Sequence, residues 1–263
     1  SAKIAGYQLN IKAQTTLAYT GPNHDCLTPF IDIRYNYKKR QYFRGTIRNI
    51  CFSGPGSSSN MVGLWFYDCF CLLDSVHVRG FKNGIQIDHY YFYSKFNDIY
   101  CTGCDRGIKA LGAANGAVFN YCHFRWCNVG FETTGHLYLN ACYFELNKTG
   151  IKLVGGGILH VNQCYFEKDS EYIIDIDSNS NNLLVILSNS IISLYALDFP
   201  SNKAAIRQKL NPGNFSTLVI NNNIIANHYA YYNPQDYRLD YFVYVEGGDI
   251  NIQAQNNKIS KLS

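Results

Sequence analysis

Five stretches of this sequence align with one another without a gap, and this internal repeat is the feature that most restricts the fold. Each stretch is centred on a residue that we place in a reference column, which consists of Val76, Ile99, Cys122, Cys142 and Cys164. These residues lie 23, 23, 20 and 22 residues apart, and in four of the five stretches a glycine follows eight residues later. Self-similarity at this period is typical of a solenoid, in which each unit covers the apolar face of its neighbour.

The pattern inside one unit identifies the kind of solenoid. Apolar residues recur three positions before the reference residue, at it and two positions after it, and a second short apolar segment such as Ile85–Ile87 follows the glycine. Alternation of buried and exposed positions is the period of a β-strand, and neither the leucine spacing nor the helix of a leucine-rich repeat is present. The sequence therefore predicts an all-β fold, a right-handed single-stranded parallel β-helix of roughly nine coils.

A column of amides supports this prediction. Two positions before the reference residue, the five units carry Asp74, Asn97, Asn120, Asn140 and Asn162. Successive coils of such a solenoid stack about 4.7–4.9 Å apart. Asparagines in register at that spacing are expected to bond amide to amide along the stack.

The repeat also predicts how the chain is organised. The regular coils occupy residues 46–194, residues 1–45 form the N-terminal edge of the β-helix, and residues 195–263 form C-terminal coils with two insertions. The insertions are 195–217, in which Ala204–Leu210 has the composition of a short helix, and the tyrosine-rich 226–247. Long loops on a rigid scaffold often carry function. Here they are expected either to do so, or to cap the solenoid or contact a neighbouring subunit.

Composition excludes some classes of partner. The net charge of +4 is too small to favour nucleic acid, and no stretch approaches the 18 apolar residues of a membrane span, so membrane insertion is not expected. Aromatic residues reach 15%, with 22 tyrosines, while charged residues are sparse at 16%. The composition is therefore compatible with a long, regular surface that is rich in aromatic residues.

The ten cysteines are expected to be structural. Cys101 and Cys104 form a CxxC pair, but no second pair lies at zinc-ligand spacing, so neither a metal site nor a cofactor is predicted. Most cysteines fall on inward positions of the repeat, where a free thiol packs as a small apolar group. Buried free thiols indicate folding in a reducing cytosol.

Residues next to the reference column are expected to point outward and to form one exposed face. One position after the reference lies a ring column, and three positions after it lies a charged column. The ring column consists of His77, Tyr100, His123, Tyr143 and Tyr165, and the charged column of Arg79, Thr102, Arg125, Glu145 and Glu167. Rings beside carboxylates and guanidinium groups suit an extended sugar polymer. Asp98 and Trp126 flank these columns and are further candidates for substrate binding, although Trp126 suits a subunit contact equally well.

Glu145 and Glu167 are the leading catalytic candidates. On adjacent coils their side chains start about 5 Å apart, and like charges at that distance favour one protonated and one ionised carboxyl group. Glycoside hydrolysis uses such a pair, with retention or inversion set by the carboxyl separation. In the alternative interpretation, both glutamates form ion pairs with Arg125, Lys148 or Lys168 on a solvated turn.

His123 and Arg125 favour a second chemistry. A polysaccharide lyase needs a cation to neutralise a uronate carboxylate and a base to remove the C5 proton. Arg125 is the candidate cation, and His123 or Tyr143 is the candidate base. A non-catalytic glycan-binding module and a purely structural shaft are also compatible with the repeat.

The coils FNYCHFRWCNVGF, LNACYFELNKTGIKL and VNQCYFEKDSEYIIDI resemble those of bacteriophage tailspikes, capsule depolymerases with a pectate-lyase-like β-helix. The opening stretch, with TTLAYTGPN before RGTIRNICFSG and GIQI, is similar to their early coils. The resemblance implies a homotrimer in the virion tail, folded in the bacterial cytoplasm, that binds and degrades capsule or O-antigen polysaccharide at the cell surface. No active-site motif of that family transfers residue by residue, so the candidate site residues rest on the column argument alone.

The expected function is therefore cleavage of a bacterial surface polysaccharide by a tailspike endoglycosidase. Glu145 and Glu167 are the expected acid and nucleophile or base, assisted by Arg125 and His123. The residues expected to hold sugar are Tyr100, Tyr143, Tyr165, Trp126, His77, Arg79 and Asp98. A lyase of the same fold and a tail adhesin without catalytic activity are the alternatives.

Overall fold

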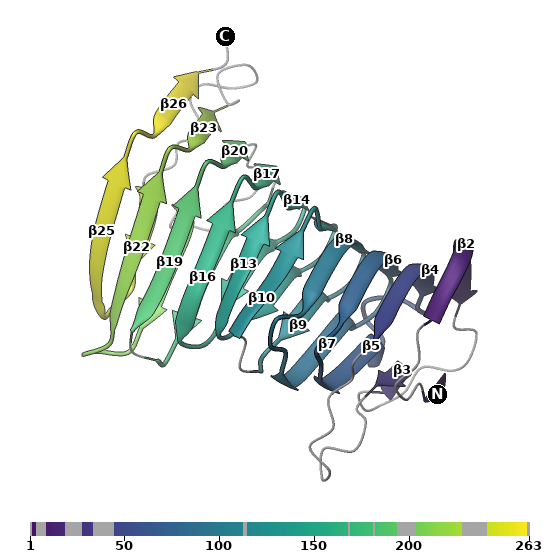
Figure 1. The fold of residues 1–263 in the computed structure, drawn as a ribbon. Helices are drawn as coiled ribbons and strands as arrows, with labels where there is room; N and C mark the ends of the chain where they lie inside the picture. Colours follow the sequence, from purple (N-terminus) through teal and green to yellow (C-terminus); the bar gives the residue numbers. More distant parts are fainter. Residues whose placement is uncertain are drawn as a thin grey trace.

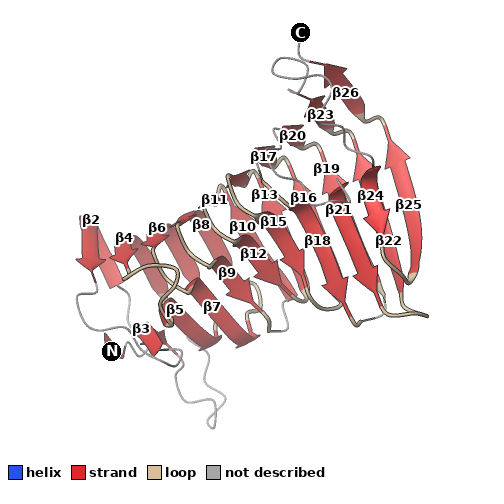
Figure 2. Ribbon diagram, turned by 180° about the vertical axis from the view of Figure 1, so that it is seen from behind, coloured by secondary structure: helices blue, strands red, loops and turns tan. Residues whose placement is uncertain are grey.

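The chain folds into a parallel β-solenoid, in which strands of successive coils stack side by side from the N-terminal to the C-terminal end (Figure 1). This computed structural model describes residues 2–3, 9–18, 28–33, 45–112, 115–167, 169–180, 182–193, 204–227 and 241–261. Within these ranges all regular structure is β, as Figure 2 shows, and no helix is long and apolar enough to cross a membrane.

Two sheets run along the solenoid, and every strand pair in them is parallel. The first sheet contains ten strands, which are β1 (Ala2–Lys3), β3 (Thr28–Ile33), β5 (Met61–Asp68), β7 (Asn83–Tyr90), β9 (Arg106–Ala110), β12 (Val129–Thr133), β15 (Thr149–Leu153), β18 (Tyr172–Ser178), β21 (Ala204–Leu210) and β24 (Tyr241–Val245). We call it the single-arm sheet, because each coil contributes one strand to it.

The second sheet contains sixteen strands and divides into two arms. It starts with four long strands, β2 (Leu9–Ala18), β4 (Thr46–Ser53), β6 (Leu72–Arg79) and β8 (Lys95–Thr102). The first arm then continues through β10 (Asn115–Asn120), β13 (His136–Asn140), β16 (Gly157–Asn162), β19 (Leu183–Ser188), β22 (Phe215–Asn221) and β25 (Asp249–Gln255). The second arm continues through β11 (His123–Arg125), β14 (Tyr143–Glu145), β17 (Tyr165–Glu167), β20 (Ile191–Ser193), β23 (Ile224–Asn227) and β26 (Lys258–Lys261). The arms separate at β8, which pairs with β10 through its first half and with β11 through its second half.

The hydrogen-bond register confirms the repeat read from the sequence. Val76 pairs with Ile99, and equivalent positions of later coils stay in step, as in Phe119 with Leu139 and Phe124 with Phe144. The prediction of an all-β fold of stacked parallel strands is therefore confirmed. Its right-handedness and its nine coils remain predictions.

Each coil turns between the two arms at a residue in the left-handed backbone region. These residues form a bend column with φ between 50° and 56°: Asn49, Ser75, Asp98, Tyr121, Ala141, Gln163, Asn189, Asn222 and Asn256. Asparagine tolerates this conformation better than other residues with a side chain, and it occupies four of the nine positions. The bend lies directly before the reference column, so the residues that precede it and those that follow it lie on different arms.

Stacked rings fill the interior. The Phe96 and Phe119 rings lie 4.3 Å apart at an interplanar angle of 5°, and Phe124, Phe144 and Phe166 form a second stack with centroid distances of 5.0 and 4.9 Å. All five rings are fully buried. Parallel stacking follows from the register, because each coil places the same ring over its neighbour.

The thiols lie in the interior, as predicted. The nine cysteines within the described ranges are free and buried. Three stacked thiols each donate to a backbone carbonyl of the preceding coil: Cys122 to Phe96, Cys142 to Phe119 and Cys164 to Leu139, at 3.4–3.5 Å. Burial raises the pKa of Cys142 and of Cys164, which keeps both protonated and able to donate.

The predicted amide ladder is present. Asn120 Nδ2 donates to Asn97 Oδ1 at 2.9 Å, and Asn140 Nδ2 donates to Asn120 Oδ1 at 3.2 Å. Further along, Asn189 Nδ2 donates to Asn162 Oδ1 at 2.9 Å. Asn97, Asn120 and Asn140 lie just before the bend and are linked from coil to coil, whereas Asn189 reaches Asn162 from the bend column itself.

A second, buried ladder follows β11 and β14. Asn147 Oδ1 accepts from the Cys127 backbone N–H, and Asp169 Oδ1 accepts from both the backbone N–H and Nδ2 of Asn147, each at 3.0 Å. Asp169 Oδ2 is buried without a partner among the described residues. Burial raises the pKa of Asp169 to about 8, so this carboxyl group is protonated at neutral pH.

The helix predicted over Ala204–Leu210 is wrong, because these residues form β21. Ile206 pairs with Ile174 on one side and with Val243 on the other, so its side chain joins the buried stack. Strand pairing on both edges outweighs the helical propensity of this segment. Both predicted insertions therefore contain coil strands, and residues 195–203 and 228–240 of them lie outside the described residues.

The bend predicts an unusual response to glycine. Ala141 has φ of 50°, where a side chain is strained, whereas Ala254 lies exposed in extended β25. We expect Ala141→Gly to be neutral or stabilising by up to about 1 kcal/mol, and Ala254→Gly to destabilise by about 0.5–1 kcal/mol. Urea unfolding of the two variants measures the difference. A loss for Ala141→Gly as large as that for Ala254→Gly would contradict the assigned bend.

The Asp169 carboxyl group predicts a pH dependence of stability. Because its pKa is raised from an ordinary value of 3.8 to about 8, the folded chain holds a proton that the unfolded chain releases, and stability falls as pH rises through this window. Asp169→Asn removes this loss, and we expect it to stabilise by about 1–3 kcal/mol at pH 9. Thermal unfolding at pH 5, 7 and 9 tests this, with exposed Asp249→Asn as control. A gap between variant and wild type that does not widen with pH would contradict it.

Candidate functional site

The ring and charged columns lie side by side on consecutive coils, on the second halves of β6 and β8 and on β11, β14 and β17. Register places His123 between Tyr100 and Tyr143, and Arg125 between Thr102 and Glu145. Glu145 in turn pairs with Glu167, and Tyr143 with Tyr165. The structure therefore brings together, on one arm of the second sheet, all the members of the two columns.

The rings of the ring column pack on one another. Centroid distances are 4.5 Å for His77–Tyr100, 4.8 Å for Tyr100–His123 and 5.8 Å for both His123–Tyr143 and Tyr143–Tyr165. Interplanar angles of 50–56° make each pair tilted. Ring faces that meet a neighbour are covered, and Tyr143 is the member with more than half of its surface exposed, at 51%.

Glu145 is the centre of a polar cluster that spans two coils. Its Oε2 lies 3.2 Å from His123 Nε2, and its Oε1 lies 3.3 Å from a terminal nitrogen of Arg125. The Arg125 guanidinium carbon lies 4.0 Å from the centroid of the Trp126 ring. The cluster thus joins a carboxylate, an imidazole, a guanidinium and an indole on a half-buried surface.

The imidazole of His123 is held neutral at pH 7. Burial lowers its pKa, the Glu145 carboxylate opposes that shift, and the Arg125 charge adds to it. A neutral imidazole that donates from Nε2 to Glu145 keeps a lone pair on Nδ1. His123 is therefore arranged as a proton acceptor whose orientation is fixed by Glu145.

The glutamates were expected to be either a catalytic pair or partners of Arg125, Lys148 or Lys168 in ion pairs, and the structure shows one of these ion pairs. Glu145 forms the expected ion pair with Arg125, whereas Lys148 pairs with Glu171 at 2.8 Å. Lys168 lies outside the described residues. Glu167 is half-buried on the next coil, directly beside Glu145 in the register.

Three further predicted residues lie at the edge of this face. His77 Nε2 is buried without a hydrogen-bond partner in the described part of the chain, and burial and then Arg79 lower the His77 pKa. Arg79 donates from Nε to Ser53 Oγ at 3.0 Å. Asp98 is exposed in the bend column, so it lies at the corner between the arms rather than within the ring face.

Tyr121 was not among the residues that the sequence predicted for this site. Tyr121, in the bend column next to β11, is 69% exposed, more than any ring of the ring column. Its position in the repeat was visible in the sequence. Its left-handed backbone was not, because neither glycine nor asparagine marks this position.

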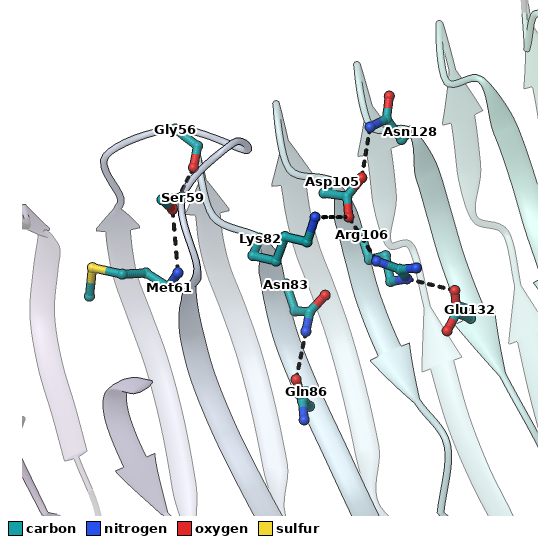
Figure 3. Close-up of polar contacts among 10 residues, drawn as sticks. All are labelled: Gly56, Ser59, Met61, Lys82, Asn83, Gln86, Asp105, Arg106, Asn128 and Glu132. Atoms are coloured by element: carbon teal, nitrogen blue, oxygen red, sulfur yellow. Dashed lines mark hydrogen bonds and ion pairs between the residues drawn. The ribbon is translucent and has the colours of Figure 1, made fainter. Parts of the chain in front are cut away.

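The single-arm sheet carries a second polar face that the sequence did not single out. Its outward column alternates in charge: Lys109, Glu132, Lys152, Asp175 and Arg207. Around it, Asp105 contacts Lys82, Arg106 and Asn128 at 2.7–3.0 Å, and Arg106 contacts Glu132 at 2.6 Å, as drawn in Figure 3. Asp105 and Arg106 are therefore part of a network rather than separate loop charges, and its charges neutralise one another.

No group of three or more histidine, cysteine, aspartate or glutamate side chains is placed to hold a metal ion within the described ranges. The chemistry that the Glu145 cluster supports directly is proton transfer and charge stabilisation.

The Glu145 cluster predicts a measurable change at His123. Because the carboxylate raises the His123 pKa against burial, we expect Glu145→Gln to lower that pKa further. Titration of the imidazole by NMR between pH 4 and 8 measures the shift, and Glu171→Gln serves as the control. An unchanged or raised His123 pKa in Glu145→Gln would contradict the assigned contact.

No protein-family profile and no curated protein matches this chain.

Proposed function

We propose that the chain binds a bacterial surface polysaccharide on the face formed by β6, β8, β11, β14 and β17 and cleaves it by hydrolysis. The observation that carries the proposal is the register pair Glu145 and Glu167 beside exposed rings. Capsule or O-antigen as the substrate, a homotrimeric assembly and a place in a phage tail rest on the resemblance of the coils to tailspikes.

The two glutamates take different roles in this proposal. Glu145 is ion-paired with Arg125, so we assign it the carboxylate role, as nucleophile or as base that activates water. Glu167 then protonates the glycosidic oxygen as the bond to the anomeric carbon breaks. Tyr143, with Tyr100 and Tyr165 in the same column, and Trp126 supply apolar surface for the sugar rings.

A β-elimination lyase is the second candidate, favoured by the neutral imidazole of His123. In that reaction His123 Nδ1 removes the C5 proton of a uronate, the C5–H electron pair forms the C4–C5 double bond, the C4–O4 bond breaks, and the departing O4 takes a proton from water. Arg125 neutralises the uronate carboxylate. Glu145 serves here as a positioning residue that orients His123.

Polymer cleavage tests both candidates. We incubate the protein with purified capsular and O-antigen polysaccharides, following polymer length and the absorbance of unsaturated uronates. Hydrolysis predicts shortening without absorbance, and a loss of about 10²-fold or more in kcat for both Glu145→Gln and Glu167→Gln, since each removes a group acting in proton transfer or attack. Glu171→Gln, which removes a carboxylate paired with Lys148 on a turn, is expected to keep full activity.

Each outcome discriminates between the candidates. Shortening with absorbance, abolished by His123→Gln, identifies the lyase. Binding without shortening identifies a non-catalytic adhesin and refutes cleavage. Absence of binding to every polysaccharide refutes the proposed function.

A further inference from the structure

Strand β11 lies between two exposed aromatic residues in left-handed backbone conformations. Tyr121, before the strand, has φ of 56° and is 69% exposed, and Trp126, after it, has φ of 55° and is 56% exposed. Between them, His123 and Arg125 reach the Glu145 carboxylate. The polar cluster therefore lies between two rings on one coil.

Both positions carry backbone strain, because the turns of the coil require the left-handed region there whichever residue is present. A left-handed residue with a side chain costs about 1–2 kcal/mol, and bulky residues there are outliers. In the column of Trp126, the two preceding coils have Gly80 and Gly103, with φ of 68° and 59°, and the next coil has Leu146, with φ of 57°. Glycine or asparagine would relieve this strain at both positions. The fold needs no ring at either position, so the two rings, which stay more than half exposed, point to a role outside the fold.

The environment leaves ring surface free at both positions. The bend column places small Ala141 after Tyr121, and the Tyr121 ring contacts no other ring among the described residues. Arg125 lies over the Trp126 ring, and more than half of the Trp126 surface is still exposed. In the ring column, by contrast, tilted neighbours cover the ring faces.

The span between the two rings suits a short oligosaccharide. Four residues lie between Tyr121 and Trp126, so five steps of extended chain, about 16 Å, are the most that can separate their backbones. A pyranose presents an apolar C–H face that packs on an aromatic ring, while its hydroxyl groups need polar partners such as those between the rings. The exposed Tyr143 ring of the next coil borders the same surface.

We infer that Tyr121 and Trp126 are the sugar-stacking residues, and that the glycan lies along β11, parallel to this strand, over His123 and the Glu145 carboxylate that contacts it. This inference rests on the proposed function and deepens it. In the proposed function the sugars stack on the ring column, whose rings cover one another. Here they stack instead on the two rings at the ends of β11. The substrate it specifies is an extended polysaccharide segment with accessible pyranose faces.

The strain itself provides variants that keep the fold. Tyr121→Asn and Trp126→Gly place residues that prefer the left-handed region at both positions, so thermal stability is expected to be unchanged or raised. Tyr93→Asn is the matched control, because Tyr93 is also left-handed, with φ of 48°, and 64% exposed. Tyr93 lies on the turn between β7 and β8, and its ring contacts the ring of Phe70.

The test measures binding to a printed array of purified bacterial capsular and O-antigen polysaccharides, and then to oligosaccharide fragments of the polymer that wild type binds. We expect Tyr121→Asn and Trp126→Gly each to raise the dissociation constant about tenfold or more, as expected for loss of a hot-spot ring. Tyr93→Asn is expected to bind as wild type does. In a Trp65→Phe background, Trp126 is the remaining tryptophan, and its fluorescence is expected to change on titration with the fragment.

The outcomes separate this inference from the proposed function. Wild-type affinity in both Tyr121→Asn and Trp126→Gly overturns the inference and leaves polysaccharide binding standing. An equal loss in Tyr93→Asn overturns the placement along β11. If wild type binds no polysaccharide on the array, the proposed function and the inference fail together.

Discussion

The bend in each coil is the constraint on which the rest of the structure depends. One residue per coil adopts the left-handed conformation, and this turn decides which side chains face the interior and which face solvent. Where the bend lies within the long strands β4, β6 and β8, the two arms stay joined. From β10 and β11 onward they separate, and the short second arm becomes a distinct surface. The candidate site begins on the long strands and extends onto this short arm.

The bend leaves backbone carbonyl groups without a partner in the strand ladder, and side chains of the reference column donate hydrogen bonds to them. In the central coils, the thiols of Cys122, Cys142 and Cys164 donate to carbonyl groups of the preceding coil. Further along, Asn223 and Asn257 donate from Nδ2 to the equivalent carbonyls at 3.0 and 2.7 Å. Thiol and amide thus perform one structural task in different coils, which accounts for the cysteines at these three inward positions.

The sequence revealed those features that recur once in every coil. Register, inward thiols and the amide ladder were predictable, because a stacked fold repeats a side chain wherever it repeats an environment. Ala204–Leu210 was mispredicted because its composition favours a helix, while its two neighbouring strands favour β structure. The residue types of Tyr121 and Trp126 gave no sign of a left-handed backbone, which only the asparagines and glycines of other coils in the same columns indicate. The contacts of Glu145 with His123 and Arg125 depend on side-chain direction, which spacing alone does not determine.

The alternating column of the single-arm sheet has a consequence for how such a chain changes length. Lys109, Glu132, Lys152, Asp175 and Arg207 alternate in sign from coil to coil. Removal of one coil would bring like charges into contact, for example Lys109 beside Lys152, whereas removal of two coils restores the alternation. Coils of this solenoid can therefore be gained or lost in pairs without placing like charges side by side in this column. Insertion or loss of an even number is the change that leaves this outer face electrostatically intact.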